Sequence, residues 1–425
     1  MNVKVLDALM GSGKTTKLIK DVSMLPDNNP VIYIAPLLSE CHRFAGTMID
    51  EEGDIVVDDN GQPIYENHHP LACKSFKHPS NKNRRGTKLE SLSQAVGLGK
   101  NIVSTHSLFR MMNKDITDKI KEKGYTLIID EVLCVWEKYT INKGNSDTTD
   151  SDNTDTDKEI ASLISSGIIE VDPYGILHWQ WDKFGVVEGT HYEETALLCD
   201  TKQLFMANGT VVIWEYPLWV LESFKEVWIA TYMFESSFMA EYFKLHGIDY
   251  KVEKFGKKPV DYKHLVTVVE DTKMNACGAK DFSLSYSSIV NKKTYNEKLK
   301  DNLYNFFRNK TKSKIHERLW TTYSARKSSI SAGRYAASWL NYNAKATNDY
   351  KEAKYVAYFV NVYANVMILA MLRSRAALFD QDKFALSEMV QFVWRSAIRE
   401  ERPIVLYVPS KRMREMFIKW INSDE

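Results

Sequence analysis

The feature that most constrains this chain is a glycine-rich segment directly after a short apolar run near its start. Residues 3–15 read Val-Lys-Val-Leu-Asp-Ala-Leu-Met-Gly-Ser-Gly-Lys-Thr. Gly11 and Gly13 permit a tight turn whose backbone N–H groups form an anion-binding nest ahead of a helix. In such a loop Lys14 reaches the β- and γ-phosphates, and Thr15 holds Mg²⁺. The segment therefore predicts a strand, a phosphate-binding loop and a helix, and with them a protein that uses a nucleoside triphosphate.

The predicted nucleotide-binding residues are consecutive along this loop: Gly11, Ser12, Gly13, Lys14, Thr15 and Thr16. The first position of the usual G-x-x-x-x-G-K-[ST] pattern is Ala8, a small residue that still allows close approach of a phosphate. The alternative is a glycine-rich turn with an incidental lysine. The strand expected before the loop and the helix expected from Lys14 favour the phosphate-binding interpretation.

Composition sets the limits for the rest of the interpretation. The chain has 425 residues, enough for two or three domains. Lys and Arg number 56 against 55 Asp and Glu, so net charge argues neither for nor against a nucleic-acid partner. Five scattered cysteines form no C-x-x-C pair, which favours reduced thiols in a cytosol. We find no apolar run near 18 residues and no signal peptide, and expect a soluble cytoplasmic protein with no membrane partner.

Short β-branched runs alternate with helical patterns, which predicts an α/β fold with parallel sheets covered by helices. We expect a first domain over residues 1–233, with an insertion within 160–222 and a disordered loop at 144–158. That loop is acidic and of low complexity, so it offers no apolar area to bury. A second α/β domain, over 234–425, lacks a phosphate-binding loop of its own.

The pattern predicts individual elements as follows. The strands are residues 3–6, 31–35, 101–104, 126–129, 167–171, 209–214, 226–230, 264–269, 318–323 and 404–408. The helices are residues 14–22, 37–44, 294–308, 353–371, 386–399 and 411–421.

Two adjacent carboxylates end the apolar run 126–129. We expect Asp130 to lie beside the phosphate-binding loop and, with Thr15, to hold Mg²⁺. Glu131 then polarises the attacking water, a general-base role for a carboxylate one residue beyond the metal ligand. Many strands end in acidic turns, so the pair is informative mainly because a phosphate-binding loop precedes it.

A second charged pattern lies in the other half of the chain. Gln391, Arg395 and Arg399 recur every four residues and share one face of the predicted helix. Such a face could project guanidinium groups across an interdomain cleft onto a γ-phosphate, as arginine fingers do. The alternative is a solvated, salt-bridged helix face. Phe392 and Trp394 favour a helix that is packed on both sides.

In this order, the segments resemble the motifs of superfamily 2 helicases, and more narrowly the compact helicase-type ATPases of tailed phages. The matching segments are residues 8–15, 35–37, 104–107, 130–132, 230–231, 320–322, 345–348 and 391–399. The resemblance implies two RecA-like parallel-sheet domains with the ATP site in the cleft between them. In the last motif the second arginine stands one residue later than the family usually has it, so Arg395 is the finger we expect.

The resemblance also implies that the protein binds the backbone of one nucleic-acid strand through the hydroxyl groups of short side chains. The candidates are Thr105, Ser107, Thr322 and Thr347, with Arg84 and Arg85 of the basic stretch 82–88 as further phosphate contacts. That stretch is equally explained as a solvated loop. The expected partner is single-stranded or forked DNA, with RNA as an alternative, and with replication or recombination proteins as possible companions.

The expected function is therefore an ATP- and Mg²⁺-dependent translocase or helicase. Three alternatives stay open: an RNA helicase, a nucleoside kinase and a phage packaging ATPase. A kinase is usually shorter and often carries a cysteine-rich lid, which this sequence lacks. A packaging ATPase needs a carboxylate cluster for its nuclease, and the nearest candidate is the single pair Asp380 and Asp382. The scattered His and Cys residues between 41 and 78 lack the spacing of a zinc finger or ribbon.

Overall fold

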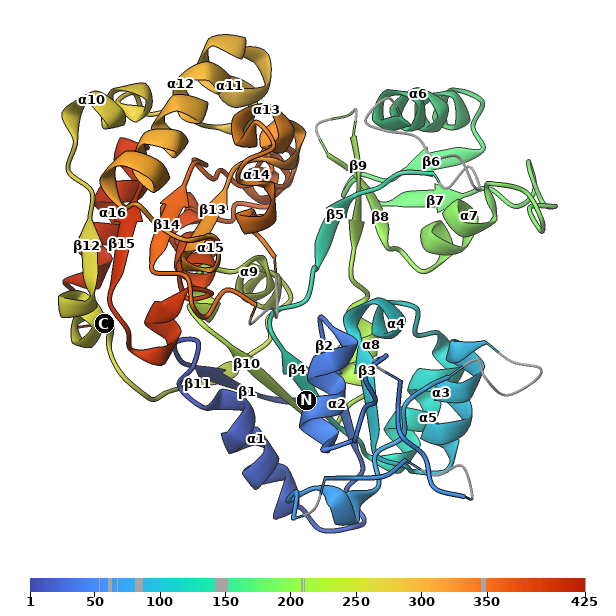
Figure 1. The fold of residues 1–425 in the computed structure, drawn as a ribbon. Coiled ribbons are helices and arrows are strands. Elements are labelled where there is room, and N and C mark those ends of the chain that lie inside the picture. Colours follow the sequence, from blue (N-terminus) through green and yellow to red (C-terminus); the bar gives the residue numbers. More distant parts are fainter. Residues whose placement is uncertain are drawn as a thin grey trace.

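The computed structural model describes residues 1–424 except 53, 60–62, 67, 81–86, 142–151, 208, 210 and 345–348, and it excludes the side chains of residues 152–155, 293 and 294. Its architecture is two separate parallel β-sheets with helices packed around them (Figure 1). The prediction of an α/β fold with parallel sheets is therefore confirmed. Among the described helices, none is long and apolar enough to cross a membrane.

The first sheet has six parallel strands in the order β11-β1-β10-β4-β2-β3. They are β1 (Asn2–Asp7), β2 (Val31–Ala35), β3 (Ile102–Thr105), β4 (Thr126–Asp130), β10 (Glu226–Thr231) and β11 (Tyr250–Lys254). Every residue of β2 and β4 is buried, as expected for central strands covered on both faces. The accompanying helices are α1 (Lys14–Ser23), α2 (Leu38–Ala45), α3 (Lys88–Gly97), α4 (His106–Arg110), α5 (Lys114–Lys123), α8 (Leu218–Glu222) and α9 (Phe238–Leu245).

This sheet extends beyond residue 233, where the sequence analysis ends the first domain. Strand β11 pairs in parallel with β1, so Val3 lies opposite Tyr250 and Asp7 opposite Lys254. A division that keeps the first sheet whole therefore falls after Lys254. The sequence did not reveal this boundary because an edge strand that follows a helix has the same pattern as the start of a new α/β unit.

The insertion departs from the first sheet after β4. Its antiparallel strands are β5 (Trp136–Lys138), β9 (Val211–Glu215) and β8 (Leu204–Ala207), with a second pair, β6 (Ile169–Val171) and β7 (Leu177–Trp179). Its helices are α6 (Asp152–Ser165) and α7 (Glu193–Asp200). The insertion thus begins near residue 136, earlier than predicted. Figure 1 shows it at the upper right, next to α14 (Val366–Ser374) of the second half, which contacts β5 and β8.

Part of the predicted disordered loop is ordered. Residues 152–158 form the first turns of α6, while 144–151 lie outside the described residues. Asp157 pairs with Lys138 at 2.7 Å, and the buried Thr156 hydroxyl accepts a hydrogen bond from the Ile141 amide at 3.3 Å. The prediction was wrong for this part because polar contacts to the insertion sheet replace the apolar burial that the composition lacks.

The second sheet has four parallel strands in the order β12-β15-β14-β13. They are β12 (Val266–Val268), β13 (Arg318–Thr321), β14 (Tyr355–Tyr358) and β15 (Ile404–Tyr407). Besides α14, its helices are α10 (Thr272–Asn275), α11 (Tyr286–Asn291), α12 (Lys293–Tyr304) with a π-helical end (Asn305–Lys310), α13 (Lys327–Ser331), α15 (Gln381–Val393) and α16 (Lys411–Ile421). Single-turn and short 3₁₀ helices are Ala72–Lys74, Phe234–Ser236, Pro259–Leu265, Ala276–Gly278, Ile315–Glu317, Ser324–Arg326, Ala336–Ser338 and Ala397–Glu400.

Two predicted helices of this half were wrong in their bounds. The predicted helix 353–371 is the strand β14 followed by a loop and α14. A continuous apolar run does not distinguish a strand buried on both faces from a buried helix. The predicted helix 386–399 starts earlier and ends at Val393. Trp394 follows in a turn, completely buried against Tyr262 and Trp420 at ring-centroid distances of 5.3 Å.

Candidate functional site

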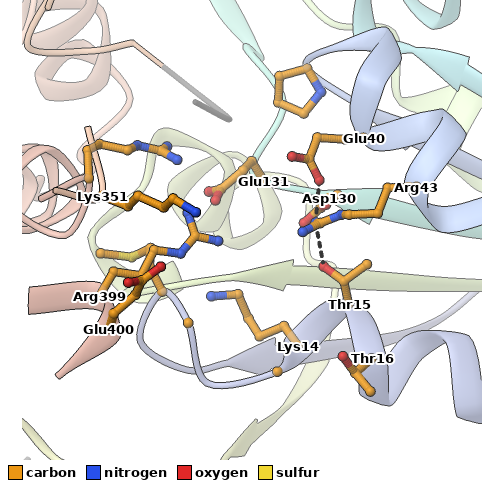
Figure 2. Close-up of a pocket in the computed structure, with 15 residues that line it drawn as sticks. Lys14, Thr15, Thr16, Glu40, Arg43, Asp130, Glu131, Lys351, Arg399 and Glu400 are labelled. Atoms are coloured by element: carbon orange, nitrogen blue, oxygen red, sulfur yellow. Dashed lines mark hydrogen bonds and ion pairs between the residues drawn. The ribbon is translucent and has the colours of Figure 1, made fainter. Parts of the chain in front are cut away.

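A cavity of about 490 Å³ lies where the carboxyl ends of β1 and β4 face the second half of the chain (Figure 2). Parallel strands present their carboxyl ends at one edge of a sheet, so the loops after them converge there. The residues lining the cavity are Met10, Gly11, Gly13, Lys14, Thr15, Thr16, Pro36, Glu40, Arg43, Asp130, Glu131, Lys351, Arg395, Arg399 and Glu400. Both halves of the chain therefore contribute its walls.

The glycine loop is anchored at the end of β1 and leads into α1. Asp7, at the end of β1, accepts hydrogen bonds from the amides of Met233 and Phe234 at 2.8 and 2.9 Å. Gly11 and Gly13 have φ values of +85° and +86°, in the left-handed region that a side chain makes costly. Helix α1 begins directly after Gly13 without a side-chain cap, so its first N–H groups are left for another acceptor.

Lys14 is turned inward onto its own loop. Its Nζ donates to the carbonyl oxygens of Ala8 at 2.6 Å and Leu9 at 3.3 Å, and the residue is only 9% exposed. Burial lowers the pKa of this ammonium, and the charges of Glu131 and Asp130 oppose that shift. An anion in the cavity would offer Lys14 a stronger acceptor than these neutral carbonyls.

Two residues of α2 that the sequence analysis did not single out face the loop. Arg43 donates from Nη2 to Thr15 Oγ1 at 3.3 Å and forms an ion pair with Glu40 (Figure 2). Their i, i+3 spacing places both on one face of the helix. The sequence carries that spacing, but the direction in which α2 presents the face depends on tertiary packing.

Asp130 and Glu131 differ sharply in their surroundings. Asp130 is buried and accepts a hydrogen bond from the Tyr33 hydroxyl at 2.6 Å, across the neighbouring strands β4 and β2. Burial, reinforced by the charge of Glu131, raises the pKa of Asp130 to about 6. Glu131 has φ +64°, a strained conformation for a residue with a side chain. Its amide donates to Ala230 O at 2.9 Å and its Oε2 accepts from Thr231 Oγ1 at 3.3 Å.

Among the described residues of the second half, three cationic side chains line the cavity, and they do not come from one helix. Arg395 lies in the turn after α15, Arg399 on the 3₁₀ helix Ala397–Glu400, and Lys351 on a loop before β14. The prediction that the two arginines share a helical face with Gln391 was wrong, since α15 ends before them. Gln391 is partly buried within α15 and is not among the lining residues. Lys351 was missed because no motif marks it.

Burial lowers the pKa of both arginines. For Arg395, the charge of Glu131 opposes this shift and favours the protonated form. For Arg399, the nearby charge of Arg43 adds to the lowering of the pKa. Cations gathered in a partly buried site repel one another, and a polyanionic ligand would relieve that repulsion.

The residues present fit a small divalent cation bound together with phosphate oxygens. Across the part of the chain that the structure describes, no cluster of three or more His, Cys, Asp or Glu side chains forms a complete metal cage. Mg²⁺ does not need one, because it keeps several waters and takes one or two protein oxygens plus substrate phosphates. Asp130 and Thr15, both at the cavity, supply oxygens of that kind.

Of the residues predicted to contact nucleic acid, the three that the structure describes, Thr105, Ser107 and Thr322, do not line this cavity. Thr105 caps α4 by accepting from the Leu108 amide at 3.4 Å, and Ser107 is exposed. Thr322 is completely buried, so its hydroxyl is not presented to a nucleic acid, which corrects that prediction. Arg84, Arg85 and Thr347 lie outside the described residues.

Fold and site together define an α/β protein of two parallel sheets, with a glycine loop from one facing arginines from the other. Residues 260–421, which contain the whole second sheet, match a family described as the YonV C-terminal Rossmann-like domain. The full chain is similar to the SPbeta prophage-derived uncharacterized protein YonV of Bacillus subtilis (strain 168). The two are 29% identical over 443 residues, and the match covers 99% of each chain. The family match begins after β11, where the first sheet is complete.

Proposed function

We propose that this chain hydrolyses ATP with Mg²⁺ and uses the reaction to translocate along or unwind nucleic acid, with DNA as the preferred partner. One observation carries the proposal: a single cavity combines the glycine loop and Asp130–Glu131 with Arg395 from the other half. A site built from two halves changes when they move relative to each other. Nucleotide turnover in it would therefore be coupled to motion between the halves.

The lining residues suit distinct tasks in that reaction. The free amides at the start of α1 and the Lys14 ammonium would bind the triphosphate, and Thr15 and Asp130 would hold the Mg²⁺ that neutralises its charge. Glu131 would orient and deprotonate water, with its carboxylate held by the hydrogen bond from Thr231. Arg395 would stabilise the charge that develops on the transferred phosphoryl group. The similarity to a prophage-derived protein supports a phage setting, and within it we propose a role in replication or recombination.

The test is ATP hydrolysis by the full chain, measured alone and with single-stranded DNA, duplex DNA or single-stranded RNA. We expect stimulation by DNA. Stronger stimulation by RNA would assign the chain to RNA instead. Phosphate transfer to a nucleoside would favour a kinase, and packaging activity with nuclease cleavage would favour a packaging ATPase. Absence of Mg²⁺-dependent hydrolysis under all conditions would overturn the proposal.

A pair of lysine variants tests whether ATP hydrolysis depends on the glycine loop. Lys14→Ala should reduce hydrolysis at least about 100-fold, because it removes a charge from the phosphate-binding loop. Lys17→Ala, one turn along α1, is the matched control. Lys17 pairs with Asp21 and Glu253 on the surface and does not line the cavity.

A further inference from the structure

Helix α2 brings a cation to the one hydroxyl of the glycine loop that would ligate a metal. Arg43 donates to Thr15 Oγ1 at 3.3 Å while its guanidinium is paired with Glu40. Figure 2 shows Arg43 reaching from α2 toward Thr15 on the side where Asp130 lies. The Glu40 side chain is 11% exposed and the Arg43 side chain 48%, so the carboxylate is buried while the guanidinium is partly in contact with water.

Arg43 and a divalent cation need the same oxygen. A metal ligand offers a lone pair at about 2 Å, and the Arg43 N–H uses a lone pair of that same hydroxyl. A guanidinium at hydrogen-bond distance from an oxygen that also binds Mg²⁺ would place two cations a few ångströms apart, where they repel strongly. Simultaneous occupation is therefore unfavourable.

We propose that Arg43 and the divalent cation are alternative partners of the Thr15 hydroxyl, and that Glu40 holds Arg43 at this oxygen in the nucleotide-free protein. Arg43 then keeps the site from binding a bare metal ion. The triphosphate shifts the balance by supplying further oxygen ligands to the metal and a new anionic partner to Arg43. This inference deepens the proposed function, since it concerns regulation of the same site.

The experiment measures Mn²⁺ binding to the nucleotide-free full chain by the electron paramagnetic resonance signal of free Mn²⁺. We expect weak binding by the unmodified chain and at least about tenfold tighter binding by Arg43→Gln. The Arg43 side chain is 48% exposed, so the substitution is compatible with folding, which a thermal melt checks. Lys351→Gln removes a charge from the same cavity at a residue that does not hydrogen-bond to Thr15, and should change Mn²⁺ affinity by less than about threefold.

A double variant tests whether the gain in Mn²⁺ affinity depends on the Thr15 hydroxyl. Adding Thr15→Val to Arg43→Gln should abolish the gain in Mn²⁺ affinity. Equal gains in Arg43→Gln and Lys351→Gln would overturn the inference by showing a general charge effect. Persistence of the gain without the Thr15 hydroxyl would overturn it as well. Failure of the proposed function is seen separately, as absence of binding of a fluorescent ATP analogue to the unmodified chain, and leaves the Mn²⁺ comparison interpretable.

Discussion

The hydroxyl of Thr231 donates a hydrogen bond to Oε2 of Glu131 at 3.3 Å, joining the ends of two neighbouring strands, β10 and β4. The contact fixes a carboxylate whose own backbone is strained, at φ +64°. Strain of this kind persists where surrounding structure determines it, and it is concentrated at functional sites. The two residues therefore form one unit in which Thr231 positions the Glu131 carboxylate.

We predict that Glu131→Gln binds ATP with near-normal affinity but lowers turnover at least about 100-fold. The amide keeps the shape and the hydrogen bond but removes the base. Thr231→Val should have a smaller effect, about threefold to tenfold on turnover with little change in nucleotide affinity. Steady-state hydrolysis and equilibrium binding of a fluorescent analogue separate the two. Normal turnover by Glu131→Gln would assign this carboxylate a structural role.

A second prediction concerns the stability cost of Asp130. Because burial raises its pKa from 3.8 to about 6, the folded state retains a proton that the unfolded state releases between these values. The ionised carboxylate thus destabilises the folded protein increasingly as pH rises, and fully above pH 6. Asp130→Asn should stabilise the nucleotide-free protein by up to about 3 kcal/mol at pH 8, and by roughly half of that at pH 5.

Thermal or urea unfolding at the two pH values measures this difference. The same variant should lose Mg²⁺-dependent nucleotide binding, so stability and binding move in opposite directions. Asp118→Asn, an identical change at an exposed position paired with Lys114, should shift stability little at either pH. A stabilisation by Asp130→Asn that does not grow with pH would contradict the explanation.

A third prediction concerns the arginines from the second half. Arg395→Ala should lower turnover by about two orders of magnitude or more while leaving ATP affinity within about threefold, since a finger acts on charge that develops in the transition state. Arg399→Ala should reduce both turnover and affinity. The aliphatic part of the Arg399 side chain packs on the glycine loop, because a Cβ added at Gly11 would lie 3.3 Å from Arg399 Cγ. The exposed Arg373 of α14, changed to Ala, is the control.

A fourth prediction concerns the attachment of the insertion. Glu215, at the end of β9, accepts hydrogen bonds from Trp136 at 2.6 Å and Arg375 at 2.8 Å, and pairs with His246 at 3.3 Å. Burial raises the pKa of Glu215, but the hydrogen bond from His246 and the charge of Arg375 outweigh it, and the pKa is lowered overall. The Arg375 guanidinium also lies 4.4 Å from the ring centre of Phe205.

Arg375→Ala should therefore cost about 1–3 kcal/mol of stability and loosen the insertion from α14. Hydrogen exchange should increase in β8 and β9 and stay unchanged in β2 and β4. Arg373→Ala, two residues earlier and exposed, should do neither. Uniform acceleration of exchange across both sheets would mean that the pair supports the whole fold and does not specifically attach the insertion.

The residues whose place at the cavity could be predicted from the sequence are those whose position depends on local geometry. Lys14 and Thr15 start the helix that follows the loop after β1, and Asp130 and Glu131 lie at the end of β4; parallel strands bring these ends together at the cavity. Arg395 also lines it, but for a reason different from the one predicted: a turn replaces the helix. Glu40, Arg43 and Lys351 could not be identified in this way, because their place in the cavity depends on how α2 and the second half dock onto the first sheet.

The strand bearing the glycine loop has a further consequence for how the protein is made. Strand β1 lies between β10 and β11, so its partners in the sheet are residues 226–231 and 250–254. It leaves the ribosome before both of these partners, and more than two hundred residues separate it from the first of them. Long-range pairing of this kind is slow and leaves an apolar segment open to aggregation. During synthesis, the apolar side chains of Val3 and Val5 therefore need protection from aggregation, for example by a chaperone. They need it long before the glycine loop that follows them can fold.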